Sequence, residues 1–324
     1  ATFDPALPLA GVILNRVGGP GHARLLTDAL EPVGVPVLGS VGEDRRLAQE
    51  QRHLGLVPAA EDPASAKRII AAAQALVERE LELEHVMALA AAAPPMSVQP
   101  WRPDAHRGPT TRRITVGVAR GAAFTFGYQE NLELLVGGGA DLAPFDPVSD
   151  EGLPRGVDAL YLGGGFPELY ADALAANSRL RHEVRSFAAT GRPVVAECAG
   201  LTYLAHGLDG RPMCGVLDAQ AHMTEHLAIG YREATAVRDS ALAPAGYRVR
   251  GQEFHRSGVS PPAGRPAAWM LADPVDARSS LPGERAEGFV RGGVHASYLH
   301  THWAAFPELA ARLLASAARD TSVG

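Results

Sequence analysis

Short apolar runs alternate with segments of helical spacing from residue 113 onward. Predicted strands cover residues 113–119, 141–145, 159–165 and 192–197, and predicted helices cover 128–136 and, in two pieces, 167–189. Within 128–136, the apolar side chains of Leu132, Leu135 and Val136 lie on one helical face. Strands and helices that alternate at this spacing are typical of a parallel α/β sheet.

The pattern changes after Cys214, where the segments become rich in β-formers. Strands are predicted over residues 230–237, 247–254 and 289–298, and a closing helix over 307–318. The α/β pattern and these later segments together make up one predicted domain, residues 113–324.

The first 92 residues show a shorter α/β pattern. Strands are predicted over 9–16 and 35–41, and helical stretches over 21–30, 43–54 and 65–92. A parallel sheet needs more than two strands, and the chain has no G-x-x-x-x-G-K-[ST] phosphate loop. We therefore expect residues 1–92 to be the C-terminal part of a nucleotide-binding α/β domain whose first strands lie outside this chain. Residues 93–112 hold five prolines and are predicted to be a linker.

Composition narrows the class of function. The 30 basic and 36 acidic side chains give a net charge of −6, which argues against binding to nucleic acid or anionic membranes. The chain has two cysteines, no signal-peptide pattern and no apolar run of membrane-spanning length. These features predict a protein of the reducing cytoplasm.

Cys198 stands out because it lies on a tight corner between a buried strand, residues 192–197, and a helix that begins at Ala199. The small neighbours Ala196, Ala199 and Gly200 suit such a turn. Most free cysteines are core residues, but a cysteine at a helix N-terminus is expected to have a lowered pKa and to lie near amides that can bind an oxyanion. The arrangement follows the logic of a nucleophile elbow.

Two further stretches are expected to meet Cys198 at the carboxyl ends of the strands. Residues 163–168, Gly-Gly-Gly-Phe-Pro-Glu, form a strand-to-helix turn with unobstructed amides. Residues 294–303 contain His295, His300 and His302, which include a candidate base for the thiol. No carboxylate or cysteine flanks these histidines at zinc spacing, so we expect no metal centre. His222, His226 and His255 are expected at the surface.

Five ordered motifs resemble the glutamine amidotransferase part of cobyrinic acid a,c-diamide synthases, whose hydrogenobyrinic acid form belongs to the aerobic cobalamin pathway. They are Gly163-Gly-Gly-Phe-Pro-Glu, Ala196-Glu-Cys-Ala-Gly-Leu-Thr-Tyr-Leu, Gly230-Tyr-Arg-Glu, Gly251-Gln-Glu-Phe-His-Arg-Ser and Ser297-Tyr-Leu-His. Residues 11–15 and 36–39 resemble the end of that family's dethiobiotin-synthetase-like ATP-binding domain. The resemblance implies a partial P-loop domain followed by a flavodoxin-like class I glutamine amidotransferase domain.

The same resemblance implies a function and a set of site residues. The activity is amidation of the a and c acetate carboxylates of the corrin ring with ammonia from glutamine, the co-substrate. Cys198 is the implied nucleophile, His300 its base, and the amides near Gly164, Gly165 and Ala199 the implied oxyanion hole. The implied substrate-binding residues are Tyr231, Arg232, Glu253 and His255.

ATP and Mg²⁺ are implied for the full-length enzyme. Because the phosphate loop is missing, we expect ligase activity to need an N-terminal segment on a longer parent chain or a separate subunit, and this chain to be only the glutaminase part. Related triad enzymes carry a glutamate two residues after the histidine, where this chain has His302, so the group that orients His300 is unassigned. Ala199 replaces a glycine usual in the family.

Several alternatives remain open at this point. The acceptor could be another acid, such as a cobyric acid precursor or a cell-wall lipid intermediate. The chain could instead be a cysteine hydrolase that handles no ammonia, or a binding module with a vestigial cysteine. Whether the corrin carries cobalt, and whether the chain forms a homodimer, are also open.

Overall fold

The computed structural model describes residues 4, 7–48, 51–52, 55–57, 59, 61–103, 113–273 and 283–319. The chain divides into two units, residues 1–100 and 101–324. This division lies within the predicted 93–112 linker, of which residues 104–112 lie outside the described part.

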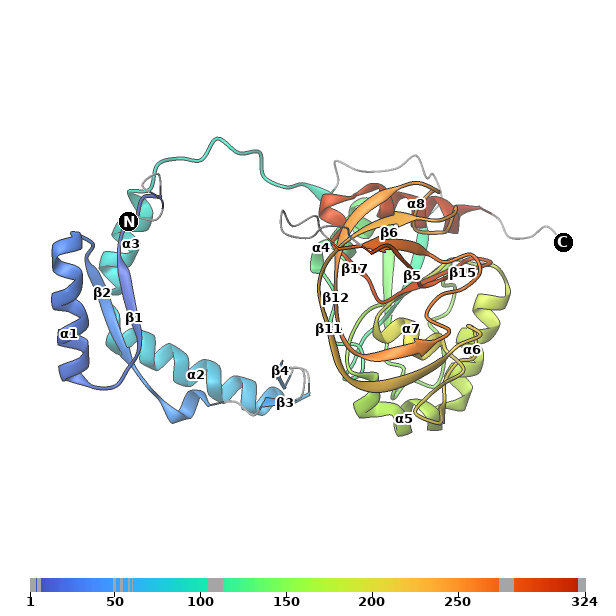
Figure 1. Cartoon of the computed structure of the whole chain (residues 1–324), viewed down its shortest axis with the longest axis horizontal. Helices are drawn as coiled ribbons and strands as arrows, with labels where there is room; N and C mark the ends of the chain where they lie inside the picture. The colour runs from blue at the N-terminus through green and yellow to red at the C-terminus, as the bar shows by residue number, and fades with distance from the viewer. Residues whose placement is uncertain are drawn as a thin grey trace. The chain divides into compact units, whose positions relative to one another are not determined.

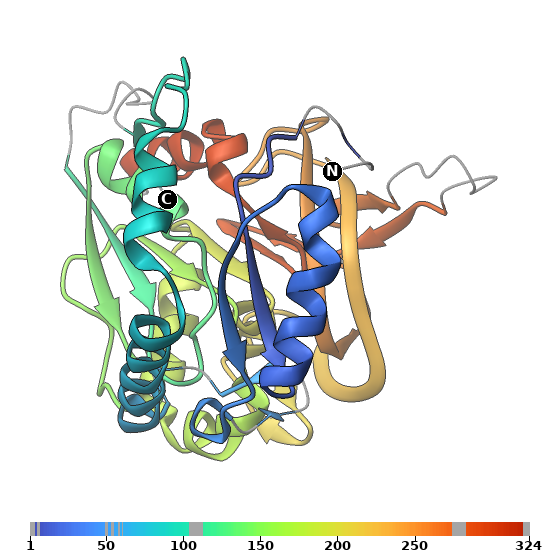
Figure 2. The ribbon, with the colours of Figure 1, turned by 90° about the vertical axis from the view of Figure 1, so that its left-hand side faces the viewer.

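The first unit is built on one parallel strand pair, β1 (Val12–Val17) and β2 (Val37–Gly42). Helix α1 (Pro20–Leu30) connects them and lies alongside both, as Figure 2 shows, followed by the short helix η1 (Glu31–Val33). Two further helices follow, α2 (Pro63–Glu80) and α3 (Leu83–Ala91). The unit is α/β, but its described residues do not establish a P-loop domain.

Two predicted helices of this unit differ from the structure. The helix predicted over 43–54 is wrong where it is described, because Asp44 caps a single turn, η2 (Arg45–Leu47), and β3 (Gln51–Arg52) then pairs with β4 (Gly55–Leu56). The stretch predicted over 65–92 breaks at Leu81, which bridges to Gly39, while the next amide donates to the Leu38 carbonyl. Tertiary pairing ends α2 there.

A six-stranded sheet forms the centre of the second unit (Figure 1), in the order β15-β16-β8-β7-β5-β6. All neighbours are parallel except β15 and β16. Taken in chain order, the five parallel strands run 2-1-3-4-5, which is the flavodoxin-like arrangement. Their bounds are β5 (Ile114–Ala119), β6 (Ala140–Phe145), β7 (Ala159–Leu162), β8 (Val194–Glu197) and β16 (Val294–Ser297), with β15 at Phe289–Arg291.

Successive side chains of the central strands enter two different cores, one on each face of the sheet. Leu160 and Leu162 join a core built with η4 (Pro167–Tyr170), α5 (Ala171–Ala176), α6 (Ser178–Ala189) and α7 (Ala199–Leu204). Ala159 and Tyr161 join the core on the opposite face, with α4 (Gln129–Gly137) and α8 (Glu308–Ala318). Both faces are covered, which explains why the strands read as continuous apolar runs.

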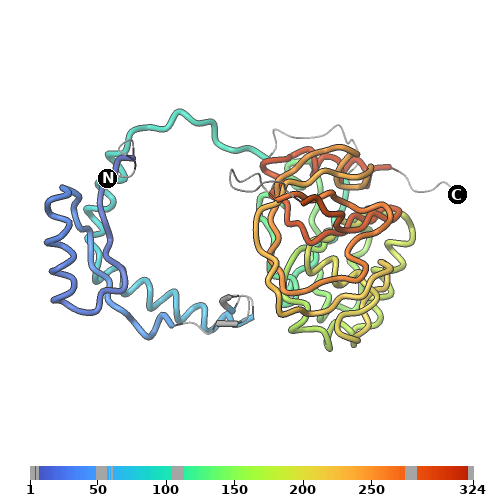
Figure 3. The backbone as a smooth tube through the Cα atoms, in the orientation of Figure 1, coloured from blue at the N-terminus to red at the C-terminus, as the bar shows by residue number. Residues whose placement is uncertain are grey.

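A second sheet packs on the α4 and α8 side, because Ala234, Val249 and Trp269 belong to that core. Its main path is β10-β9-β11-β12-β17, with β13 and β14 attached to β11. The long antiparallel hairpin of β11 and β12 is visible as the yellow and orange trace of Figure 3, beside the red β17. The bounds are β9 (Gly207–Leu208), β10 (Arg211–Pro212), β11 (Gln220–Ala236), β12 (Arg248–Ser260), β13 (Trp269–Ala272), β14 (Arg285–Glu287) and β17 (His300–Thr301).

The strand predicted over 289–298 is two antiparallel strands, β15 and β16, because Gly292 turns the chain at φ 56°. After β16 the chain leaves the central sheet and joins the second one as β17, followed by η5 (Trp303–Ala305). No helix within the described ranges is both long and apolar enough to cross a membrane.

Candidate active site

Cys198 occupies a strained corner between β8 and α7. Its backbone has φ 50° and ψ −98°, a conformation that costs energy and persists only when the surroundings fix it. Its amide donates to the Ser297 carbonyl at 2.8 Å, and the Gly200 amide donates to the Gly163 carbonyl at 3.0 Å. A β-carbon on Gly200 would lie 2.3 Å from the Leu162 carbonyl oxygen. Neighbouring strands therefore fix the corner from both sides.

The structure brings His300 to the same edge of the sheet as Cys198. Glu197 and Thr301, which adjoin these two residues in sequence, are joined by hydrogen bonds: Glu197 Oε1 accepts from the Thr301 amide at 3.1 Å and from Thr301 Oγ1 at 2.8 Å. The thiol and the imidazole are each one residue away from this contact. The fold therefore brings two residues about 100 positions apart in sequence next to one hydrogen-bonded contact.

The His300 imidazole is nearly enclosed, with 3% of the residue exposed. The Phe126 ring meets it edge-on, with the ring centroids 4.9 Å apart. Gly164 lies so close that a β-carbon there would be 2.6 Å from His300 Cε1. A cavity of about 490 Å³ borders His300, and its other lining residues include Tyr128, Tyr231, Arg250, Gln252 and Phe306.

Burial decides the charge state of both groups. Burial, with a smaller contribution from the Glu168 carboxylate, raises the pKa of the Cys198 thiol to about 12. It also lowers the pKa of the His300 imidazole to about 4, with a smaller contribution from His255. The expectation of a lowered thiol pKa is therefore wrong for the resting protein, because burial outweighs the amide of Ala199 and a helix of only six residues. The resting pair is a neutral thiol and a neutral imidazole.

Of the three predicted oxyanion-hole amides, one is already engaged. The Gly164 amide donates to the Phe126 carbonyl at 2.8 Å, so it is not available for a substrate oxygen. The amides of Gly165 and Ala199 donate to no oxygen or nitrogen atom among the described residues. Of the predicted set, only the Gly165 and Ala199 amides are left as candidates for binding a substrate oxygen, and the Ala199 amide contacts the Cys198 sulfur.

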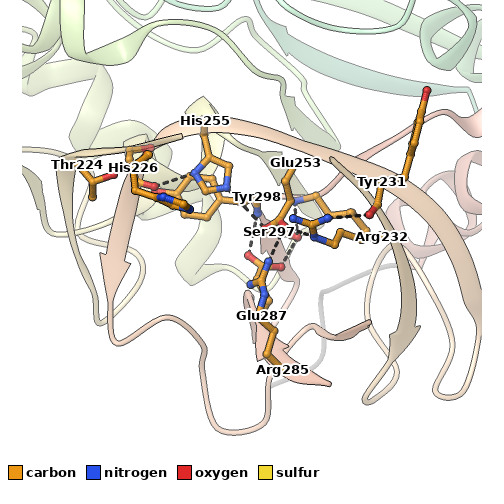
Figure 4. Close-up of polar contacts among 12 residues, drawn as sticks. Thr224, His226, Tyr231, Arg232, Glu253, His255, Arg285, Glu287, Ser297 and Tyr298 are labelled. Atoms are coloured by element: carbon orange, nitrogen blue, oxygen red, sulfur yellow. Dashed lines mark hydrogen bonds and ion pairs between the residues drawn. The ribbon is translucent and has the colours of Figure 1, made fainter. Parts of the chain in front are cut away.

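A second polar cluster surrounds Glu253 on β12 (Figure 4). Its carboxylate accepts from Arg232 at 2.7 Å and from Arg285 at 2.5 Å, and His255 Nε2 lies 3.6 Å away. Although burial raises the pKa of Glu253, the nearby His255, Arg285 and Arg232 side chains lower it to about 2. The carboxylate is thus ionised and held between two guanidinium groups.

The predicted substrate-binding residues do not all lie in this cluster. The expected surface position of His255 is wrong: it is buried, its ring stacks on Tyr298 at 3.9 Å, and its Nε2 has no hydrogen-bond partner within the described part of the chain. The carbonyl of Tyr231 accepts from Arg232 at 2.8 Å, but its side chain points away from this cluster and is exposed beside the cavity, with 66% of the residue accessible (Figure 4). His222 and His226 are exposed, as predicted.

We expect Glu253→Gln to lower the free energy of unfolding by about 3 kcal/mol at pH 7, because it leaves two guanidinium groups without their buried carboxylate. Glu233→Gln is the matched control. It breaks the more exposed ion pair with Arg250 on the same hairpin and should cost below about 1 kcal/mol. Urea unfolding measures both.

The effect of Glu253→Gln should shrink as the pH falls from 4.5 toward 2. The folded pKa of Glu253 lies below its usual 4.5, so its contribution to stability is present above that value and is lost on acidification. Equal losses for the two variants at pH 7 would contradict a buried role for Glu253.

The other candidate histidines have local partners. His295 is buried, its Nδ1 lies 3.0 Å from Ser240 Oγ, and burial lowers its pKa to about 3. His302 Nε2 lies 3.5 Å from Glu130, and its ring contacts Tyr128. Across the described ranges, no group of three or more histidine, cysteine, aspartate or glutamate side chains is placed to bind a metal ion.

A family profile and several known enzymes match this chain. The profile of the CobB/CobQ-like glutamine amidotransferase domain matches residues 115–308. The chain is 46% identical to hydrogenobyrinate a,c-diamide synthase of Streptomyces coelicolor, over 97% of this chain and 69% of that one. The chain belongs to the hydrogenobyrinate and cobyrinate a,c-diamide synthase family.

Other members of the a,c-diamide synthase family are similar over the same extent. The hydrogenobyrinate enzyme of Mycobacterium bovis is 47% identical over 99% of this chain and 68% of its own length. The cobyrinate enzyme of Gloeobacter violaceus is 42% identical over 93% of this chain and 64% of its own length.

Several residues near His300 could not be predicted from the sequence. Phe126, Glu287 and Thr301 reach His300, or the segment that carries it, only through tertiary contacts. Glu197 did have a signal, since a carboxylate inside an apolar strand needs a partner. Its partners Tyr161 and Thr301 could not be read from the sequence.

Proposed function

We propose that this chain releases ammonia from glutamine for amidation of the a and c acetate carboxylates of hydrogenobyrinic or cobyrinic acid, in cobalamin biosynthesis. The observation that carries the proposal is the strained Cys198 corner with His300 held at the same sheet edge. The names of the similar enzymes support the acceptor acid. A cytoplasmic setting fits two cysteines that are both free and buried.

In this mechanism the neutral pair reacts only when glutamine binds. The Cys198 thiol passes its proton to His300, and Sγ attacks the carboxamide carbon of glutamine. The amides of Gly165 and Ala199 stabilise the resulting oxyanion. The tetrahedral intermediate then collapses, and the imidazolium gives its proton to the leaving ammonia. Water, activated by His300, hydrolyses the thioester and restores the thiol.

The four proposed substrate-binding residues differ in what they offer glutamine. Arg232 and Glu253 are engaged with each other, so they serve to fix the wall of the site. His255 has a buried ring nitrogen that makes no hydrogen bond among the described residues, with the Glu253 carboxylate 3.6 Å away, and His300 lies near it. We assign His255 a direct contact with the substrate and Tyr231 a place on the rim.

ATP and Mg²⁺ fit the residues of the first unit poorly. The strand-to-helix turn after β1 has Pro20 at the first helical position, which removes one amide, and the Gly18 amide donates to His22. No lysine follows this turn in the way a phosphate loop requires. We therefore assign no ATP-dependent step to the described residues of this unit. The complete ligase reaction still requires activation of the acceptor carboxylate.

We expect the chain to release glutamate and ammonia from glutamine. Its kcat/KM should fall only below about pH 5. A base needs its neutral form, and burial holds the pKa of His300 near 4, so activity should fall as the pH drops through that value rather than through 6.5. Initial rates measured from pH 4 to 8 test this, with a return to pH 7 to exclude unfolding.

Three results would contradict parts of this proposal. No glutamate release at any pH would count against the proposed function. Turnover of small esters without glutamine hydrolysis would favour a cysteine hydrolase instead. An acidic limb near pH 6.5 would contradict the assigned environment of His300.

A further inference from the structure

No described carboxylate hydrogen-bonds to the His300 ring. The position two residues later is His302, which lies against Glu130 and Tyr128. The imidazole itself packs edge-on with the Phe126 ring and leaves no room for a β-carbon at Gly164. A base needs a defined orientation to take a proton from a nucleophile, so the orientation of His300 must come from elsewhere.

Glu197 is an unusual residue for the interior of a sheet, since only 3% of it is exposed. Its two oxygens have different tasks. Oε2 accepts from the Tyr161 hydroxyl at 2.9 Å, within the central sheet. Oε1 accepts from both the amide and the hydroxyl of Thr301, across to β17. The carboxyl group thus links the strand that ends at Cys198 to the residue that follows His300.

Thr301 is fixed in turn by helix α4 and η5. Its hydroxyl accepts from Trp303 Nε1 at 2.9 Å, and its carbonyl accepts from Asn131 Nδ2 at 3.0 Å. Every polar group of Thr301 therefore has a partner, and rotation of its side chain would break two hydrogen bonds.

The other end of the His300 segment is anchored by a second buried carboxyl group. Glu287 accepts from Ser297 Oγ at 2.6 Å and from the Tyr298 amide at 2.9 Å (Figure 4). Ser297 also offers its carbonyl to the Cys198 amide. His300 therefore lies between two anchored points, and both connect to the Cys198 corner or its sheet.

We propose that Glu197, through Thr301, positions the His300 backbone and ring against Cys198, in place of a carboxylate on the imidazole. Glu197 and Thr301 are positioning residues, because neither touches the reacting atoms. This inference rests on the proposed roles of Cys198 and His300 in glutamine hydrolysis.

The test compares two hydroxyl donors to the same carboxyl group. Thr301→Val removes the donor beside His300, and Tyr161→Phe removes the donor on the other oxygen. We expect Thr301→Val to lower kcat for glutamine about 10-fold with KM nearly unchanged, since a small misplacement of a base slows chemistry more than binding. Tyr161→Phe should keep kcat within about 3-fold of the wild-type value. This should hold even if its melting temperature falls as much as that of Thr301→Val. Thr301→Ser should restore the rate.

Equal losses of kcat in Thr301→Val and Tyr161→Phe, each following the melting temperature, would show a structural role only and overturn the inference. Crystal structures of the wild-type chain and both variants give a readout that needs no turnover. The His300 ring should move in Thr301→Val and stay in place in Tyr161→Phe. If the wild-type chain released no glutamate, the proposed function would fail, while the ring positions would still decide whether Glu197 and Thr301 place His300.

Discussion

Cys198→Ala is expected to abolish glutamine hydrolysis, with a loss of roughly 10⁴-fold or more, as removal of an enzyme nucleophile causes elsewhere. Without the sulfur no thioester can form, and His300 alone has no covalent route to ammonia. The rest of the site should persist, because the corner is fixed by backbone hydrogen bonds of Cys198 and Gly200. Glutamate release measures the loss, and mass spectrometry after exposure to diazo-oxonorleucine should show an adduct on Cys198 in the wild type only.

Cys214→Ala is a matched control, since Cys214 is the other cysteine of the chain and is equally buried. Burial raises its thiol pKa to about 12 as well, but Cys214 lies beside Tyr203 and Arg181 and not on the corner between β8 and α7. It should keep its turnover and still form the Cys198 adduct. An adduct on Cys214, or activity that survives Cys198→Ala, would remove Cys198 from the mechanism.

Gly164→Ala is expected to lower kcat about 100-fold, the scale of loss when a catalytic group shifts by about 1 Å. The new methyl group would lie 2.6 Å from His300 Cε1 and 3.3 Å from the Phe126 ring, so the imidazole would have to move. The Gly164 amide could keep its hydrogen bond to Phe126, and the strand-to-helix turn should still form. Steady-state kinetics with glutamine, together with far-UV circular dichroism, would show a fold that is kept and a rate that is lost.

Gly127→Ala provides the comparison, because Gly127 is exposed next to Phe126 in the connection between β5 and α4, and a β-carbon there meets nothing within 4 Å. Its kcat should be that of the wild type. If Gly164→Ala were equally active, His300 would have room that the structure does not give it, and its assignment as a tightly held base would fall.

The sequence was sufficient to predict the central sheet and the corner, because both depend on local signals. Apolar runs, helical spacing and small residues around Cys198 are all short-range features, and the strands β5, β7 and β8 lie where these features predict them. His300 was found as one candidate among three neighbouring histidines. The family resemblance singled out His300, and the structure places His295 and His302 against Ser240 and Glu130 instead.

The remaining properties depend on contacts between distant residues and could not be predicted. The helix expected over 43–54 gives way to a capped turn and a strand pair. The thiol pKa is raised by burial and by Glu168, neither of which leaves a trace beside Cys198 in the sequence. The Gly164 amide is taken by Phe126, a partner 38 positions earlier in the chain. In each case a tertiary contact overrides a local expectation.

The neutral state of Cys198 also bears on how the protein survives oxidants. Peroxides and disulfides react with thiolates and hardly at all with thiols. Because burial raises the thiol pKa to about 12, Cys198 of the resting protein is held almost entirely as the thiol at pH 7. A nucleophile that ionises only in the presence of its substrate is protected from sulfenic acid formation between turnovers, so the burial that makes Cys198 a weak acid also preserves it.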